Sequence, residues 1–212
     1  MKGILGLLRR AAPGTRAQEG ASDSSAFFSS AFAQHDAGNA PLVPWEARAV
    51  EIGAEALSPR RGSALLQQLW SKDKYMAQLG EAGLCRLEPF FTFAKLGSNR
   101  DLVRQNEYGN FMVVLLSGSV SIDRLQTWGE VLRLAEAHPG DILGEMSLLD
   151  SGNRLSSCTT LGPCSVAVLS AEALDEMVTK DPALAANLVA LLARKLSLRL
   201  RAVSARLSQR PN

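Results

Sequence analysis

The sequence predicts an α+β fold in which an antiparallel β-sandwich or barrel is flanked by helices on both sides. Between residues 90 and 170, short runs of β-branched and aliphatic residues recur about every 8 to 12 positions between turn residues. Before and after this region, apolar residues recur with the period of a helix. The 212 residues are 46% hydrophobic, which suffices for a packed core and excludes disorder throughout the chain.

The first 40 residues are rich in Ala, Ser and Gly, and we expect a flexible segment over 1–40. Its first ten residues, MKGILGLLRR, place aliphatic side chains between basic ones. They are too few for a signal peptide, which leaves a frayed terminus or a short amphipathic anchor on anionic lipid. Residues 41–89 then carry three helical stretches, the second of them with Ser63 as its expected N-cap.

The strongest β signal is the run FMVVLLSGSVSI over residues 111–122. Ser117-Gly118 interrupts it, so we expect a bend or bulge at that point. Several shorter apolar runs precede and follow it, and we assign residues 90–170 to the β-barrel.

Two helices are expected over residues 171–208. Ser170 is the predicted N-cap of the first, and Asp181-Pro182 opens the second with an N-cap followed by proline. The second helix is long, and its last apolar positions follow the spacing of a helix–helix seam. These positions are Leu196, Leu200, Val203 and Leu207.

The segment with the clearest functional signal is residues 140–158, GDILGEMSLLDSGNRLSSC, between two strand-like runs. A short helical turn after Gly144 would leave unpaired backbone amides that bind an anion, and the glycine suggests a close approach to the backbone. Arg154 follows ten positions later, with a guanidinium that suits two phosphate oxygens. Glu145 supplies an acceptor for a sugar hydroxyl, so the set predicts a site for ribose and phosphate together.

This segment resembles the phosphate-binding cassette of the cyclic nucleotide-binding domain, the module of catabolite activator protein and of cAMP-dependent kinase regulatory subunits. The family pattern is Phe-Gly-Glu, an aliphatic, a small residue, two aliphatics, a loop, then Arg, Ser/Thr/Ala and Ala. Here it reads LGEMSLL over residues 143–149, a loop over 150–153, and Arg154-Leu155-Ser156. The resemblance covers about residues 70–207 and implies a β jelly-roll barrel, a cupin-like double-stranded β-helix, with a long C-terminal helix.

The resemblance implies a sensor that binds cAMP or cGMP as its ligand, without a cofactor, and signals through the C-terminal helix to an unknown protein effector. Arg154 would pair with the cyclic phosphate and Glu145 with the ribose 2′-hydroxyl. By position on the last helix, Ser197 and Arg199 are possible lids over the purine, or solvent-facing residues. That helix would also join two subunits into a homodimer, unless it packs only on its own barrel. The implied ligand-binding residues are Gly144, Glu145, Met146, Ser147, Arg154, Leu155 and Ser156.

One departure from the family pattern concerns ligand contacts. Leu155 stands where the family has Ser, Thr or Ala, and the missing hydroxyl is worth about 1 kcal/mol for a neutral contact. This weakens binding or loosens the choice between cAMP and cGMP, unless Ser156 compensates. The glycine-acid pair before the long strand is altered to Glu107-Tyr108-Gly109, which we assign to a loop outside the pocket. The alternative is a degenerate, ligand-free fold that acts as a protein interaction module.

Enzymatic activity is not expected. His35 and His138 lie far apart in sequence, and neither has a partner at metal-ligand spacing. Cys85, Cys158 and Cys164 form no CxxC motif and no disulfide framework, which favours a reducing cytoplasm. Nucleophile-elbow, Walker A and dinucleotide motifs are lacking as well.

Two further expectations concern partners. No apolar run approaches the roughly 18 residues of a transmembrane helix. The resemblance also reaches nearly the last residue, so we expect no helix-turn-helix and no sequence-specific DNA binding, although a truncated transcription regulator is an alternative.

The formal net charge of +2 conceals a division along the chain. Residues 41–181 carry 13 basic and 18 acidic residues, whereas residues 182–212 carry six basic residues and no acidic one. This excess is larger than a helix C-terminus needs to compensate its dipole. We therefore expect the basic helix to dock an acidic partner, an anionic surface or the acidic body of the protein itself, with Arg201, Arg206 and Arg210 among the contacts.

Overall fold

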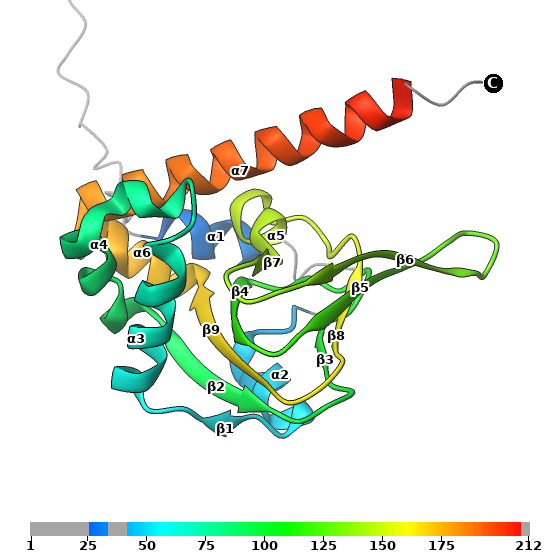
Figure 1. The fold of residues 1–212 in the computed structure, drawn as a ribbon, viewed down its shortest axis with the longest axis horizontal. Helices are drawn as coiled ribbons and strands as arrows, with labels where there is room; N and C mark the ends of the chain where they lie inside the picture. The colour runs from blue at the N-terminus through cyan, green and yellow to red at the C-terminus, as the bar shows by residue number, and fades with distance from the viewer. Residues whose placement is uncertain (1–25, 34–41, 209–212) are drawn as a thin grey trace, which may run out of the picture.

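The computed structural model describes residues 26–33 and 42–208, which form two facing antiparallel β-sheets with most of the helices packed on one side (Figure 1). The strand order is β1-β2-β9-β4-β7 in the five-stranded sheet and β3-β8-β5-β6 in the four-stranded sheet. The strands are β1 (Glu55–Ala56), β2 (Thr92–Leu96), β3 (Asp101–Val103), β4 (Phe111–Ser117), β5 (Val120–Leu125), β6 (Val131–Ala137), β7 (Ile142–Leu143), β8 (Ser157–Thr160) and β9 (Cys164–Ser170). The predicted α+β jelly roll, with N-terminal helices and a long C-terminal helix, is confirmed.

Strand β4 is the centre of the structure, because both of its faces are buried. Val113 and Leu115 pack in the core between the two sheets, whereas Met112, Val114 and Leu116 pack against the helices. This two-sided burial explains why the run lacks the alternation of a half-exposed strand. The pairing of β4 with β9 shifts register between Leu115 and Ser117, at the predicted bend.

Most helical elements that precede the sheets cover the five-stranded sheet, whereas the helix Trp45–Ile52 packs Trp45 and Ile52 in the core between the sheets. Helix α3 begins with Ser58 as N-cap, whose side chain accepts a hydrogen bond from the Arg61 backbone, and not at Ser63. Proline at the first helical position moves this start upstream, and Ser63 lies buried within the helix. The elements are α2 (Trp45–Ile52), α3 (Pro59–Trp70), α4 (Gly80–Arg86), and 3₁₀ turns at Met76–Leu79 and Glu88–Phe90.

Helices α6 (Ala171–Lys180) and α7 (Pro182–Ser208) close the described chain as predicted. The Ser170 side chain caps α6 by accepting a hydrogen bond from the Ala173 backbone. Helix α7 crosses above the sheets, and its C-terminal end lies apart from them in this view (Figure 1). No helix in the described ranges is long and apolar enough to cross a bilayer.

Helix α1 (Phe27–Ala33) lies within the segment predicted to be flexible; of residues 1–40, those outside 26–33 are not among the described residues. The Asp175 carboxylate on α6 accepts hydrogen bonds from the backbone of Phe28 and of Ser29, both at 2.8 Å. Phe32 is buried in the core beside the helices. So short a helix depends on such tertiary contacts, which local composition does not reveal.

Candidate functional site

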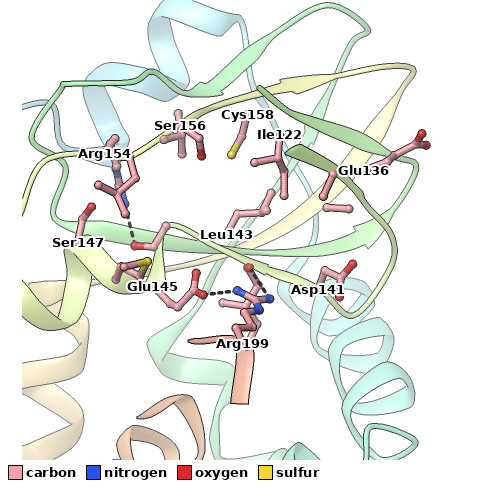
Figure 2. Close-up of a pocket in the computed structure, with 17 residues that line it drawn as sticks. Ile122, Glu136, Asp141, Leu143, Glu145, Ser147, Arg154, Ser156, Cys158 and Arg199 are labelled. Atoms are coloured by element: carbon pink, nitrogen blue, oxygen red, sulfur yellow. Dashed lines mark hydrogen bonds and ion pairs between the residues drawn. The ribbon is translucent and has the colours of Figure 1, made fainter. Parts of the chain in front are cut away.

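A cavity of about 330 Å³ lies between helix α5 (Glu145–Asp150), the four-stranded sheet and helix α7 (Figure 2). All seven residues implied as ligand-binding line it, and Arg199 of α7 reaches into it. Ser197 is exposed and does not line it. The lining residues are Val103, Ile122, Ala135, Glu136, Ala137, Asp141, Ile142, Leu143, Gly144, Glu145, Met146, Ser147, Arg154, Leu155, Ser156, Cys158 and Arg199.

Gly144 adopts the left-handed conformation, with φ of 75°, immediately before the short helix predicted after it. A Cβ atom at this position would overlap Nη1 of Arg154. The glycine is therefore required twice, by its backbone conformation and by the guanidinium that lies against it. The close approach expected from the sequence is thus made by Arg154.

Arg154 is only 3% exposed, and its guanidinium is fixed by backbone carbonyls (Figure 2). Nη1 donates to the Gly144 carbonyl at 2.7 Å, and Nη2 donates to the Phe111 carbonyl at 2.6 Å. The guanidinium also lies over the Phe111 ring, 4.7 Å from its centroid. Burial lowers the pKa of Arg154 to about 10, so the side chain keeps its charge at neutral pH with neutral groups as hydrogen-bond acceptors.

The loop over residues 107–109 does not line the cavity, but it supports Arg154 directly. A Cβ atom on Gly109 would lie 2.5 Å from Nη2 of Arg154, which only glycine avoids. The backbone N–H of Arg154 donates to the Glu107 carbonyl at 2.8 Å. The altered Glu107-Tyr108-Gly109 sequence therefore contacts both the side chain and the backbone of Arg154.

Glu145 is 6% exposed and forms an ion pair with Nη1 of Arg199 (Figure 2). Nη2 of Arg199 lies 3.5 Å from the Ile142 carbonyl. Burial raises the pKa of Glu145 above the ordinary carboxyl value, and the Arg199 charge opposes this rise. Arg199, one of the two possible lid residues, thus contacts the carboxylate expected to bind ribose.

The other wall of the cavity is apolar and comes from the strands. Sequence reasoning missed it, although the alternation of β5, β6 and β8 is the available signal. Burial raises the pKa of the Cys158 thiol to about 12, so this cysteine is a neutral part of the wall. The apolar wall comprises Val103, Ile122, Ala135, Ala137, Leu143 and Cys158.

The remaining implied residues differ in exposure. Ser147 is buried, Ser156 is half-buried, and Met146 and Leu155 are exposed at the rim. Leu155 therefore places an aliphatic side chain where the family has a small or hydroxyl-bearing residue.

Basic residues of α7 contact the body of the protein at three points. Lys195 forms an ion pair with Asp73 at 2.8 Å, and Arg194 lies over the Tyr75 ring at 5.5 Å. Together with the Arg199–Glu145 pair, these contacts support the acidic body as one partner of the basic helix. Arg201 is exposed, and the side chains of Arg206 and Arg210 are outside the described part of the structure.

Across residues 26–33 and 42–208, no group of three or more His, Cys, Asp or Glu side chains is arranged to hold a metal ion. The charged and hydroxyl side chains that line the cavity come from two arginines, two serines and three carboxylates, of which only Glu145 is buried. This set matches a ligand with both a phosphate and hydroxyl groups.

Comparison with known proteins gives the same assignment. Residues 94–181 match the family model of the cyclic nucleotide-binding domain. A 92-residue segment is 36% identical to the cyclic AMP receptor protein of Thermus thermophilus, over 43% of either chain. It is 32% identical to a CRP-like cAMP-activated global transcriptional regulator of Mycobacterium tuberculosis, over 43% of this chain and 41% of that one.

A cyclic nucleotide-binding domain from Methylobacillus flagellatus shares the fold, with a TM-score of 0.66 and 21% identity over 75% of this chain and 89% of that one. The alignments span less than half the length of the two curated relatives. Residues 94–181 are thus a ligand-binding domain and not a catalytic one. Over residues 94–181, less than half of its length, the chain therefore matches the cyclic nucleotide-binding domain family.

Proposed function

We propose that this chain is a cyclic nucleotide sensor that binds cAMP or cGMP and passes the bound state through α7 to a protein effector. The observation that carries the proposal is the placement of Arg154 and Glu145 on one cavity, with an α7 residue paired to the carboxylate. One cavity thus combines a phosphate partner, a ribose partner and the element that responds.

At the phosphate end, Arg154 provides a fixed charge. Its position is held by carbonyls of Gly144 and Phe111, which do not neutralise it. A cyclic phosphate therefore gains a charge-assisted interaction with a side chain whose geometry is set before binding. The amides of Gly144, Glu145 and Met146, which the family resemblance implicates, add donors on the same side.

At the ribose end, the ligand competes with the protein. The 2′-hydroxyl needs the Glu145 carboxylate, and Arg199 already binds this carboxylate. A nucleotide that takes over Glu145 weakens one of the three contacts that the basic residues of α7 make with the body. Binding then shifts α7 toward a detached position, because the ligand favours the state in which the pair is broken.

At the base end, the apolar wall accepts either purine by packing. Leu155 offers no hydroxyl to distinguish guanine from adenine, and half-buried Ser156 is the hydroxyl nearest to it in the sequence. We therefore propose weak discrimination between cAMP and cGMP.

We also propose that the C-terminal half of α7 joins two copies of the chain. Leu200 and Val203 are exposed there, at two positions of the predicted seam. Light scattering after size exclusion would show a dimer for the wild type and a monomer for Leu200→Glu. Leu207 of the seam lies outside the described side chains.

The three free cysteines suit a reducing compartment, and we propose the cytoplasm.

Calorimetric titration with cAMP and with cGMP tests the proposed site. Arg154→Ala should abolish measurable binding, whereas Arg100→Ala, an exposed arginine outside the cavity, should leave it unchanged. Equal binding by wild type and Arg154→Ala would reject the assigned site.

One observation favours a second function, a ligand-free interaction module. Glu145 is already paired by Arg199, and Arg154 by two carbonyls, so the polar groups are satisfied without a nucleotide. A thermal-shift panel of cyclic mono- and dinucleotides separates the two functions. A shift with any of them supports the sensor, and no shift with all of them supports the module.

A further inference from the structure

Helix α2 lies upstream of residues 94–181, yet it contacts the residues that hold Arg154. Trp45 and Arg48 are three positions apart, so both side chains lie on one face of the helix. Both are buried, Arg48 with only 1% of its surface exposed. Each begins a separate chain of contacts that ends at the phosphate-binding arginine.

The first chain of contacts is aromatic. The Trp45 ring meets the Phe111 ring edge-on, with centroids 5.6 Å apart. The same Phe111 lies against the Arg154 guanidinium with its ring and accepts a hydrogen bond with its carbonyl. Trp45 therefore fixes the residue that makes two contacts with Arg154.

The second chain of contacts is charged. Arg48 pairs with Glu107 through Nη2 and with Glu51 through Nη1, at 2.6 Å for the latter. Glu107 accepts the backbone N–H of Arg154, and the Asn106 N–H donates to the Arg154 carbonyl, both at 2.8 Å. The position of this loop, and with it the backbone of Arg154, is thus tied to a buried side chain of α2.

Burial of the charged Arg48 side chain costs desolvation free energy, which packing alone does not explain. Its Nε atom is buried without a hydrogen-bond partner among the described residues. Apolar residues often replace buried ion pairs with no loss of stability, so the retained charge points to a positional task. The task consistent with its contacts is to hold the loop that supports Arg154.

We propose that Trp45 and Arg48 are positioning residues for Arg154, so that helix α2 sets how tightly the cavity holds a phosphate. The consequence for nucleotide affinity rests on the proposed function, whereas the effect on the Arg154 side chain does not.

The first test measures solvent exchange of the Arg154 side chain in the protein without any nucleotide. NMR of the guanidinium N–H groups in Arg48→Met and Trp45→Leu should show exchange with solvent faster than in the wild type, because each substitution removes a contact that holds the partners of Arg154 in place. Ile52→Ala, a buried substitution on the same helix, controls for lost stability, and Arg60→Met controls for a lost surface arginine. Exchange in both variants equal to that of Ile52→Ala would overturn the proposal.

The second test measures cAMP affinity. Arg48→Met should raise Kd about tenfold, and the effect should vanish in an Arg154→Ala background, since it acts through Arg154. Arg48→Lys should restore part of the affinity because it still reaches one carboxylate, and it replaces Arg48→Met if that variant does not fold. If the wild type binds no cyclic nucleotide, the proposed function fails, and the exchange experiment still decides the role of α2.

Discussion

Replacing Arg199 by Gln should make the cavity bind nucleotide more tightly. In the ligand-free protein Arg199 pairs with Glu145, the carboxylate that the ribose needs, so removal of the arginine removes a competitor. Gln keeps the length and polarity of the side chain but not its charge. The expected change therefore isolates the ion pair.

The size of this effect follows from the exposure of the two partners. Glu145 is buried, but the Arg199 side chain is 49% exposed, so solvent screens the pair. We take about 1 kcal/mol, the upper end for exposed pairs. Because 1.4 kcal/mol corresponds to a factor of ten, Kd should fall about fivefold.

Calorimetry with cAMP measures the change in Kd. Amide hydrogen exchange along α7 measures the release of this helix from the body of the protein. Arg199→Gln should show faster exchange in the C-terminal part of α7 without ligand. Arg201→Gln, on the same helix but not lining the cavity, is the matched control. A weaker affinity in Arg199→Gln would refute the competition and make Arg199 a direct ligand contact; an unchanged affinity would show that the pair does not oppose binding.

Three further outcomes are expected. Gly144→Ala should lose nucleotide binding and about 1 kcal/mol of unfolding free energy, measured by titration and denaturant unfolding, because its φ is positive and the new methyl overlaps Arg154. Burial raises the pKa of Glu145, so this residue contributes stability that is present in acid and lost as pH rises through the raised pKa. Glu145→Gln should therefore exceed the wild type in urea midpoint at neutral pH, with a gap that closes toward acid, and a constant gap would contradict this. Iodoacetamide at pH 7.5 should label exposed Cys85 and leave Cys158, with its pKa of about 12, unlabelled in a mass spectrum of the folded protein.

Much of the candidate site could be predicted because its geometry is local. Gly144 and Arg154 are ten residues apart, and the turn, the glycine and the arginine all belong to one segment between two strands. A left-handed glycine before a short helix is a matter of local backbone conformation, which sequence expresses directly. Phe111, whose carbonyl accepts a hydrogen bond from Arg154, lies 43 positions upstream of it, and no local rule connects those residues.

The sequence alone determined the α+β class, most strands between residues 90 and 170, the long basic helix and the cassette, because hydrophobic period, caps and turn residues act over a few neighbouring positions. Tertiary structure alone decided which acid the basic helix meets. Arg199 and Glu145 are separated by 54 positions, and their pairing depends on how α7 crosses the sheets. The same is true of α1, whose N-terminus is held by Asp175 across 147 positions. Such contacts depend on the packing of whole elements, so the charge pattern showed that a partner was needed but not where it lies.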